Sequence, residues 1–126
     1  MNSASRDKKN RLIYSFRYAI SGINEAFKQE RNLKIHLLVS IIVILMGLVL
    51  SISYIEWLFI LLAIGGMLSL ELLNSSIERV VDLVTEDYHP LAKAAKDIAA
   101  GAVLIFAVIS VIIGLIIFLP KLANLI

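Results

Sequence analysis

Four polar side chains recur along one stretch of the chain with a spacing that suits a shared chemical surface. Glu71, Asn74, Glu78 and Asp82 stand at positions i, i+3, i+7 and i+11, so on a helix they form one polar stripe. The stripe begins where a long apolar run ends, and ionisable groups at such a place pair, face a bundle interior or do chemistry. Three carboxylates and an amide in line at a membrane edge could hold a metal ion and a general base.

Depth and ligand chemistry suggest separate roles for these groups. Glu71 is nearest the apolar run, and burial makes a carboxylate a stronger base at neutral pH. Mg²⁺ takes oxygen ligands, often one or two carboxylates together with substrate phosphates. Glu78 lies about two helical turns from Glu71, so one could bind metal while the other works separately. Lys96 could neutralise phosphate charge, helped by the N–H groups of a helix that starts near Pro90.

The same groups also allow a structural interpretation, in which they pair among themselves. Asp97 would then pair with Lys93, and Glu78 with Arg79 of a neighbouring subunit. His89 precedes a proline and is most simply a helix cap or turn residue. The alignment of four polar groups, together with an opposing lysine and aspartate, favours a functional role over a structural one.

The elements that position these residues are predicted to be helices of a single all-α membrane domain, residues 1–126. The chain is 60% hydrophobic with a mean hydropathy of +0.89, and its apolar residues are concentrated in segments. It has no cysteine, which excludes disulfides and Cys-ligated metals, and no Walker, dinucleotide-binding or HExxH motif. We expect spans at residues 35–53, 55–73 with a polar extension to 85, and 91–119 including a polar lead-in, with Pro120 marking the exit.

In the N-terminal amphipathic region, residues 1–34, the stretch from about Asn10 to Arg31 is predicted to form a helix in the membrane interface, after a frayed polar end at 1–8. Apolar residues recur there at helical spacing among basic ones, and the alternative is a helix packed on a soluble core. Eight of the twelve Lys and Arg residues lie in this region, and the connection at 51–56 has none. The positive-inside rule therefore predicts a cytoplasmic N-terminus and active site, and a C-terminus outside.

Three spans cannot easily enclose a polar site alone, so a small oligomer is expected. Small residues in the second and third spans would permit close helix approach, either between subunits or within one chain; these are Gly65, Gly66, Ala95, Ala99 and Ala102.

The stripe and the sequence after it resemble the small integral-membrane diacylglycerol kinase family of bacteria. The resemblance rests on ELLNSSIERVVD at 71–82 and YHPLAKAAKDIAAGAV at 88–103, and ERNLKIH at 30–36 and Gly22 also fit. It covers about residues 10–120. The ERNxxIH and HPLAK forms are similar to the Gram-positive branch, whose members resemble undecaprenol kinases.

This resemblance implies a homotrimer of three-span subunits in the bacterial plasma membrane, with sites shared between subunits. The implied reaction is phosphorylation of a membrane lipid alcohol by ATP with Mg²⁺, with undecaprenol as the first choice and diacylglycerol as the alternative. No nucleic-acid partner is expected. Ala99 and Ala100 replace a more polar small pair of the diacylglycerol-specific branch, which weakens a direct transfer of lipid specificity.

The resemblance also implies roles for individual residues. Glu71 would be the general base, Asn74 would orient the base or the substrate, and Lys96 and Asp97 would engage phosphates. Glu30 and Glu78 would hold the metal bound to ATP, with Glu25 as the competitor of Glu30 if the register slips. The remaining expected contacts are Asp87, Tyr88 and His89 at the nucleotide, Arg11 and Tyr18 at ATP or lipid, and Ala100 at the lipid.

A non-enzymatic transporter or accessory subunit is the rival interpretation. Intramembrane carboxylates also form proton or cation relays, but a relay needs ionisable groups near the middle of the bilayer. Here they cluster at one edge and the centres of all three spans are uncharged. The sequence therefore favours a kinase.

Overall fold

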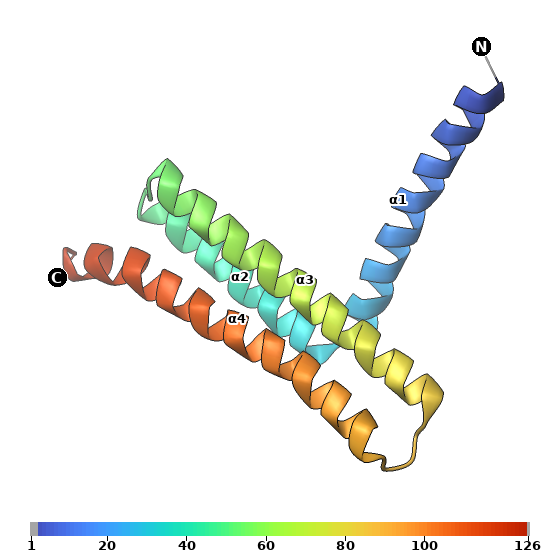
Figure 1. Cartoon of the computed structure of the whole chain (residues 1–126). Helices are drawn as coiled ribbons and strands as arrows, with labels where there is room; N and C mark the ends of the chain where they lie inside the picture. The colour runs from blue at the N-terminus through green and yellow to red at the C-terminus, as the bar shows by residue number, and fades with distance from the viewer. Residues whose placement is uncertain (1–2, 126) are drawn as a thin grey trace.

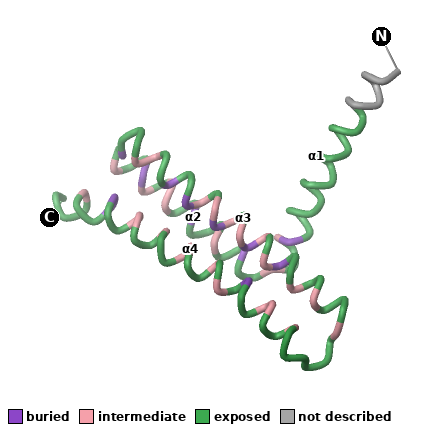
Figure 2. Tube along the Cα trace, in the orientation of Figure 1, coloured by how far each residue is buried: buried purple, intermediate pink, exposed green. Residues whose placement is uncertain are grey.

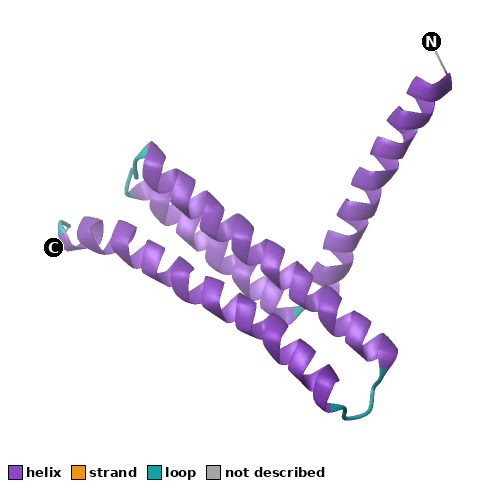
Figure 3. Cartoon of the chain, in the orientation of Figure 1, coloured by secondary structure: helices purple, strands orange, loops and turns teal. Residues whose placement is uncertain are grey.

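The protein is helical throughout the region that its structure describes. A computed structural model describes residues 3–125, and side-chain surroundings from residue 10 onward. Within this region the chain forms four helices and no strand (Figures 1 and 3). Their bounds are Ser3–Gln29 for α1, Arg31–Val49 for α2, Tyr54–Val84 for α3 and Pro90–Ala123 for α4. Helices α2, α3 and α4 are each long and apolar enough to span a membrane, which confirms the three expected spans.

Local sequence explains where two of these helices begin. The Ser53 hydroxyl accepts a hydrogen bond from the N–H of Glu56 at 3.3 Å, and the Glu56 carboxylate accepts one from the N–H of Ser53 at 2.6 Å. This capping box starts α3. At α4, the Nδ1 of His89 accepts from the N–H of Leu91 at 3.2 Å, and Pro90 occupies the first turn. The interpretation of His89 as a helix cap is confirmed.

One predicted boundary is wrong. The helix of the first span ends at Val49 and does not continue to residue 53, because the backbone turns at Leu50 and at Ser51, whose φ is 49°. Helix α4 continues past Pro120 to Ala123, and the exit of the third span from the membrane at Pro120 stays a prediction. Proline removes only its own N–H, and its carbonyl still accepts from the N–H of Asn124 at 3.2 Å, so one more helical turn follows it.

Helix α3 is the element against which the others pack. It runs beside α4 along most of its length and beside α2 (Figure 1). At one end, a small core cluster joins Ile52, Ile60, Ile117 and Phe118. The Lys121 ammonium also pairs with Glu56 there at 3.2 Å. At the other end, α3 and α4 continue past the point where α2 begins and meet in the 85–89 loop (Figure 1).

Glycine allows close approach at one place between α3 and α4. A Cβ on Gly66 would lie 2.2 Å from the Cζ of Phe106, whereas a Cβ on Gly65 would meet nothing within 4 Å. Gly66 therefore packs against a helix of its own chain. The sequence had left open whether the small residues pack within one chain or between subunits. Gly65 remains on the outer surface of α3.

Much of the apolar surface of the spans is exposed in the single chain (Figure 2). Leu62, Ile98 and Ile116 are examples, on two different helices. Helix α1 leaves the other three at a steep angle, and only its C-terminal end contacts them (Figure 1). Ala26 is buried at this end, while residues 10–25 are exposed.

Candidate active site

The predicted polar stripe forms on α3. Glu71 is buried, Asn74 and Glu78 are half-buried, and Asp82 is exposed, so the stripe runs from the protein interior toward the 85–89 loop. The Nδ2 of Asn74 donates a hydrogen bond to Glu78 Oε1 at 2.9 Å. The Oδ1 of Asn74 is buried and has no hydrogen-bond partner. A buried acceptor without a donor is costly, and it is suited to receive a ligand group.

The most deeply buried acidic group has a partner on α2. The Nε2 of His36 lies 3.0 Å from Glu71 Oε1, and the Glu71 side chain is only 6% exposed. His36 closes the ERNLKIH motif at 30–36, and no role was predicted for it. One signal in the sequence could have indicated a role for His36. It is a titratable residue close to the start of an apolar run, and membrane spans rarely carry such a residue without a function.

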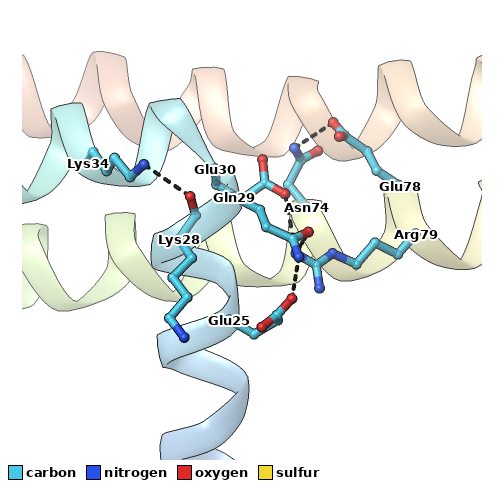
Figure 4. A network of polar contacts seen from close by, with 8 residues as sticks. All are labelled: Glu25, Lys28, Gln29, Glu30, Lys34, Asn74, Glu78 and Arg79. Carbon is cyan, nitrogen blue, oxygen red and sulfur yellow. Dashed lines mark hydrogen bonds and ion pairs between the residues drawn. The ribbon is translucent and has the colours of Figure 1, made fainter.

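The junction between α1 and α2 brings a second acidic group to α3. Glu30 has extended backbone angles between the two helices, and its carboxylate lies 3.7 Å from the Arg79 guanidinium. Arg79 also donates to the Gln29 side chain at 3.0 Å (Figure 4). Glu25 instead accepts a hydrogen bond from Gln29 on its own helix. These contacts link Glu30 directly to α3, and the choice of Glu30 over Glu25 as a metal ligand stays a prediction.

Charged groups of α3 and α4 meet beside the 85–89 loop. Lys96 pairs with Asp82 across the two helices, and this hydrogen bond raises the pKa of Lys96 above the ordinary lysine value. Lys93 pairs with Asp97 on α4, as the structural interpretation expected. A concave region of about 330 Å³ lies here, and its polar lining residues are Asp82, Thr85, Glu86, Asp87, Tyr88, His89, Lys93 and Lys96. Asp97 is not among them.

Two expected site residues lie apart from this group within one chain. Arg11 and Tyr18 are exposed on the part of α1 that leaves the other helices, and Tyr18 stacks on Tyr14 with ring centroids 6.4 Å apart. Ala100 is exposed on α4. Their roles stay predictions that the single chain does not assemble.

Comparison with known proteins shows the family of the chain. Residues 17–118 match the family model described as prokaryotic diacylglycerol kinase. The chain belongs to this family. The family expected from the polar stripe and the class of enzyme, a lipid kinase, are thereby confirmed.

Individual members of the prokaryotic diacylglycerol kinase family are similar over most of their length. The undecaprenol kinase of Bacillus subtilis (strain 168) is 56% identical over 117 residues, which cover 93% of this chain and 95% of that protein. The diacylglycerol kinase of Synechocystis sp. is 44% identical over 90% of this chain and 66% of that protein. The diacylglycerol kinase of Escherichia coli (strain K12) is 28% identical over 81% and 84%, respectively.

A family of kinases implies ATP as the phosphate donor, and the chain can be tested for a fit to the accompanying cation. Among the described residues, no group of three or more His, Asp and Glu side chains comes together as a closed metal site. Mg²⁺ does not need one, because it is usually held by one or two carboxylates and the substrate phosphates. Glu78, with the unpartnered Oδ1 of Asn74 beside it, offers oxygen donors of this kind, so the residues fit.

Proposed function

We propose that this protein transfers the γ-phosphoryl group of ATP to the hydroxyl group of a membrane lipid alcohol, and that undecaprenol is the preferred acceptor. The observation that carries the chemistry is the buried Glu71 carboxylate, at the apolar end of a stripe whose other end reaches charged groups. A hydroxyl from the bilayer and a phosphate from water could meet along such a stripe. The choice of undecaprenol is supported by the similarity to the Bacillus subtilis enzyme over nearly the whole chain.

In this reaction Glu71 is the general base. The lipid oxygen attacks the γ-phosphorus, the bond from that phosphorus to the bridging oxygen of ADP breaks, and the hydroxyl proton passes to the Glu71 carboxylate. Asn74 lies one turn further along α3 and orients the substrate or the base. Burial of Glu71 keeps water away from the reacting oxygen, which limits hydrolysis of ATP.

The charged end of the stripe binds the nucleotide. Glu78 and Glu30 would hold Mg²⁺, which neutralises phosphate charge, and Lys96 would add a cation beside the same phosphates. The concave region at the 85–89 loop is where Asp87, Tyr88 and His89 would contact ATP. Asp97 would take part after exchanging its pairing with Lys93.

The functional unit is proposed to be a homotrimer with sites shared between subunits. The position of Arg11 and Tyr18, which a neighbouring subunit's site could receive, supports this, and so does Gly65, a small residue that is exposed on the second span. Helix α1 would lie in the interface plane of the plasma membrane, with the N-terminus and active site cytoplasmic and the C-terminus outside. The eight Lys and Arg residues in 1–34 support this orientation.

The experiment that tests the function is transfer of labelled phosphate from ATP in mixed micelles, with undecaprenol and diacylglycerol offered separately and in competition. Preference for undecaprenol supports the proposal. Diacylglycerol is the second candidate, because the Synechocystis relative is named a diacylglycerol kinase. Preference for diacylglycerol would change the proposed acceptor but not the proposed catalytic residues. No transfer to either lipid by intact protein with Mg²⁺ would contradict the proposal and favour a non-enzymatic role.

A further inference from the structure

The contact between His36 and the proposed base, Glu71, has no role in the proposed function. His36, in the second turn of α2, places its Nε2 3.0 Å from Oε1 of Glu71 on α3. The His36 side chain is 27% exposed and that of Glu71 is 6% exposed, so the imidazole is the more accessible partner of the two. A buried carboxylate needs hydrogen-bond donors or an opposite charge, and within the described residues the imidazole is the group that the structure places beside Glu71.

The surroundings of His36 are otherwise apolar. The imidazole borders a groove of about 310 Å³ among α2, α3 and α4, whose other lining residues are apolar except for Ser40 and Ser110. None of these carries a charge. The titratable group that faces His36 from α3 is Glu71, and the part of α4 that lines the groove contributes no titratable group. The Ser40 hydroxyl donates to the His36 carbonyl at 2.7 Å and leaves the ring nitrogens free for Glu71 and the groove.

One consequence concerns the geometry of the base. At 3.0 Å from Oε1, the Nε2 of His36 is close enough to donate a hydrogen bond that would fix which oxygen of the carboxylate faces the imidazole and leave Oε2 available to a second donor. The incoming lipid hydroxyl is such a donor. Misplacing a reacting group by about 1 Å can cost about a hundredfold in rate, so a restraint on Glu71 has a measurable kinetic effect.

We propose that His36 is a positioning residue for Glu71. Its Nε2–H donates to Oε1 and holds the carboxylate so that Oε2 takes the proton of the lipid hydroxyl. His36 keeps its own proton throughout, and the bonds that form and break are those of the phosphoryl transfer already described. The inference rests on the proposed function, because it assigns a part in the same reaction.

Two substitutions separate hydrogen bonding from packing. His36→Gln keeps an N–H donor at the end of the side chain, whereas His36→Leu keeps apolar volume and removes the donor. We expect His36→Leu to lower kcat by about a hundredfold and His36→Gln to lower it by about tenfold or less. The KM for MgATP should stay within about twofold in both, because His36 lies at the apolar end of the stripe. A packing role predicts the reverse order, with Leu tolerated in an apolar setting and Gln harmful.

If His36→Leu does not fold, a third variant, His36→Asn, can replace it in the comparison with His36→Gln. His36→Asn is polar but one methylene shorter than Gln, so its amide should not reach Glu71 and kcat should fall well below that of His36→Gln. Thermal unfolding in detergent shows which variants are folded. An active wild type with equal kcat in the Gln and Leu variants, or in the Gln and Asn variants, overturns the role of His36 and leaves the proposed function standing. A wild type without lipid kinase activity overturns both.

Discussion

Asn74 donates a hydrogen bond to Glu78 at 2.9 Å while its own carbonyl oxygen, Oδ1, is buried without a partner. The amide therefore fixes one carboxylate and presents a free acceptor next to it. Oxygen atoms grouped in this way suit a hard cation bound together with phosphate. A buried polar group without a partner is open to water, an ion or a ligand, and this pair lies between Glu71 and the 85–89 loop.

Replacing Glu78 with glutamine should weaken the use of magnesium. Glu78→Gln keeps the size of the side chain but removes the negative charge that favours a divalent cation. We expect the Mg²⁺ concentration for half-maximal rate to rise roughly tenfold or more. The measurement is the initial rate of lipid phosphorylation across a magnesium titration at fixed total ATP. An unchanged titration would remove Glu78 from the metal site.

The same magnesium titration distinguishes Glu30 from Glu25, the two candidates for the second carboxylate that binds the metal. Glu30 contacts Arg79 on α3, whereas Glu25 contacts Gln29 within α1. We expect Glu30→Gln to raise the magnesium requirement by about tenfold and Glu25→Gln to leave it within about twofold. The two variants remove the same charge from positions five residues apart, so each controls for the other. A larger effect in Glu25→Gln would assign the ligand to Glu25 instead.

Replacing Glu71 with glutamine should abolish turnover without abolishing nucleotide binding. An amide cannot accept the lipid proton, and general base catalysis typically contributes about 10² to 10⁴ in rate. The variant should retain its oligomeric state and its affinity for MgATP, both measurable by gel filtration in detergent and by nucleotide titration. Turnover close to that of the wild type would exclude Glu71 as the base.

The sequence was sufficient to predict the helices and the polar stripe because both depend on local patterns. Long apolar runs indicate spans, and the spacing of Glu71, Asn74, Glu78 and Asp82 places them on one helical face whatever the tertiary structure. The cap at His89 and Pro90 was also local, and it is confirmed. Pro120 was predicted to mark the exit of the third span; the helix itself runs one turn further, because proline lacks only its own N–H and its carbonyl still accepts from Asn124.

Contacts between helices could not be predicted in the same way. The contact of His36 with Glu71, and that of Lys96 with Asp82, join residues whose register depends on how α2 and α4 pack against α3. No spacing within one helix specifies that register. The sequence also could not decide whether Gly66 faces a helix of its own chain or another subunit, which the Phe106 ring settles.

Lys96 should contribute a charge that does not change across the neutral range. Its hydrogen bond with Asp82 raises its pKa, so the bound proton stabilises the pair fully below the ordinary lysine value of about 10.4 and is lost only as the pH rises through the higher folded value. We expect Lys96→Met to lower kcat/KM for MgATP by at least about tenfold at every pH between about 6.5 and 9.

The matched control for Lys96 is Lys121→Met, which removes a paired lysine at the opposite end of α4. Its kcat/KM for MgATP should equal that of the wild type. If the effect of Lys96→Met disappears toward pH 9, the lysine is titrating there and the stabilising contact with Asp82 does not operate.

The two adjacent glycines of α3 should respond differently to the same added methyl group. At Gly66 the new Cβ would clash with the Phe106 ring, so α3 and α4 would have to separate or the ring would have to move, at a cost of about 1–3 kcal/mol in the free energy of unfolding. At Gly65 the added Cβ meets open space within the chain, and alanine should stabilise the helix by roughly 0.5–1 kcal/mol.

Thermal unfolding of Gly66→Ala and Gly65→Ala in one detergent measures this difference, and cross-linking reports the oligomeric state in the same samples. A loss of trimer confined to Gly65→Ala would place Gly65 against a neighbouring subunit, because within the chain nothing opposes its Cβ. Equal stability of both variants would show that the Phe106 ring moves away at little cost, so that close packing of α3 on α4 would not depend on Gly66.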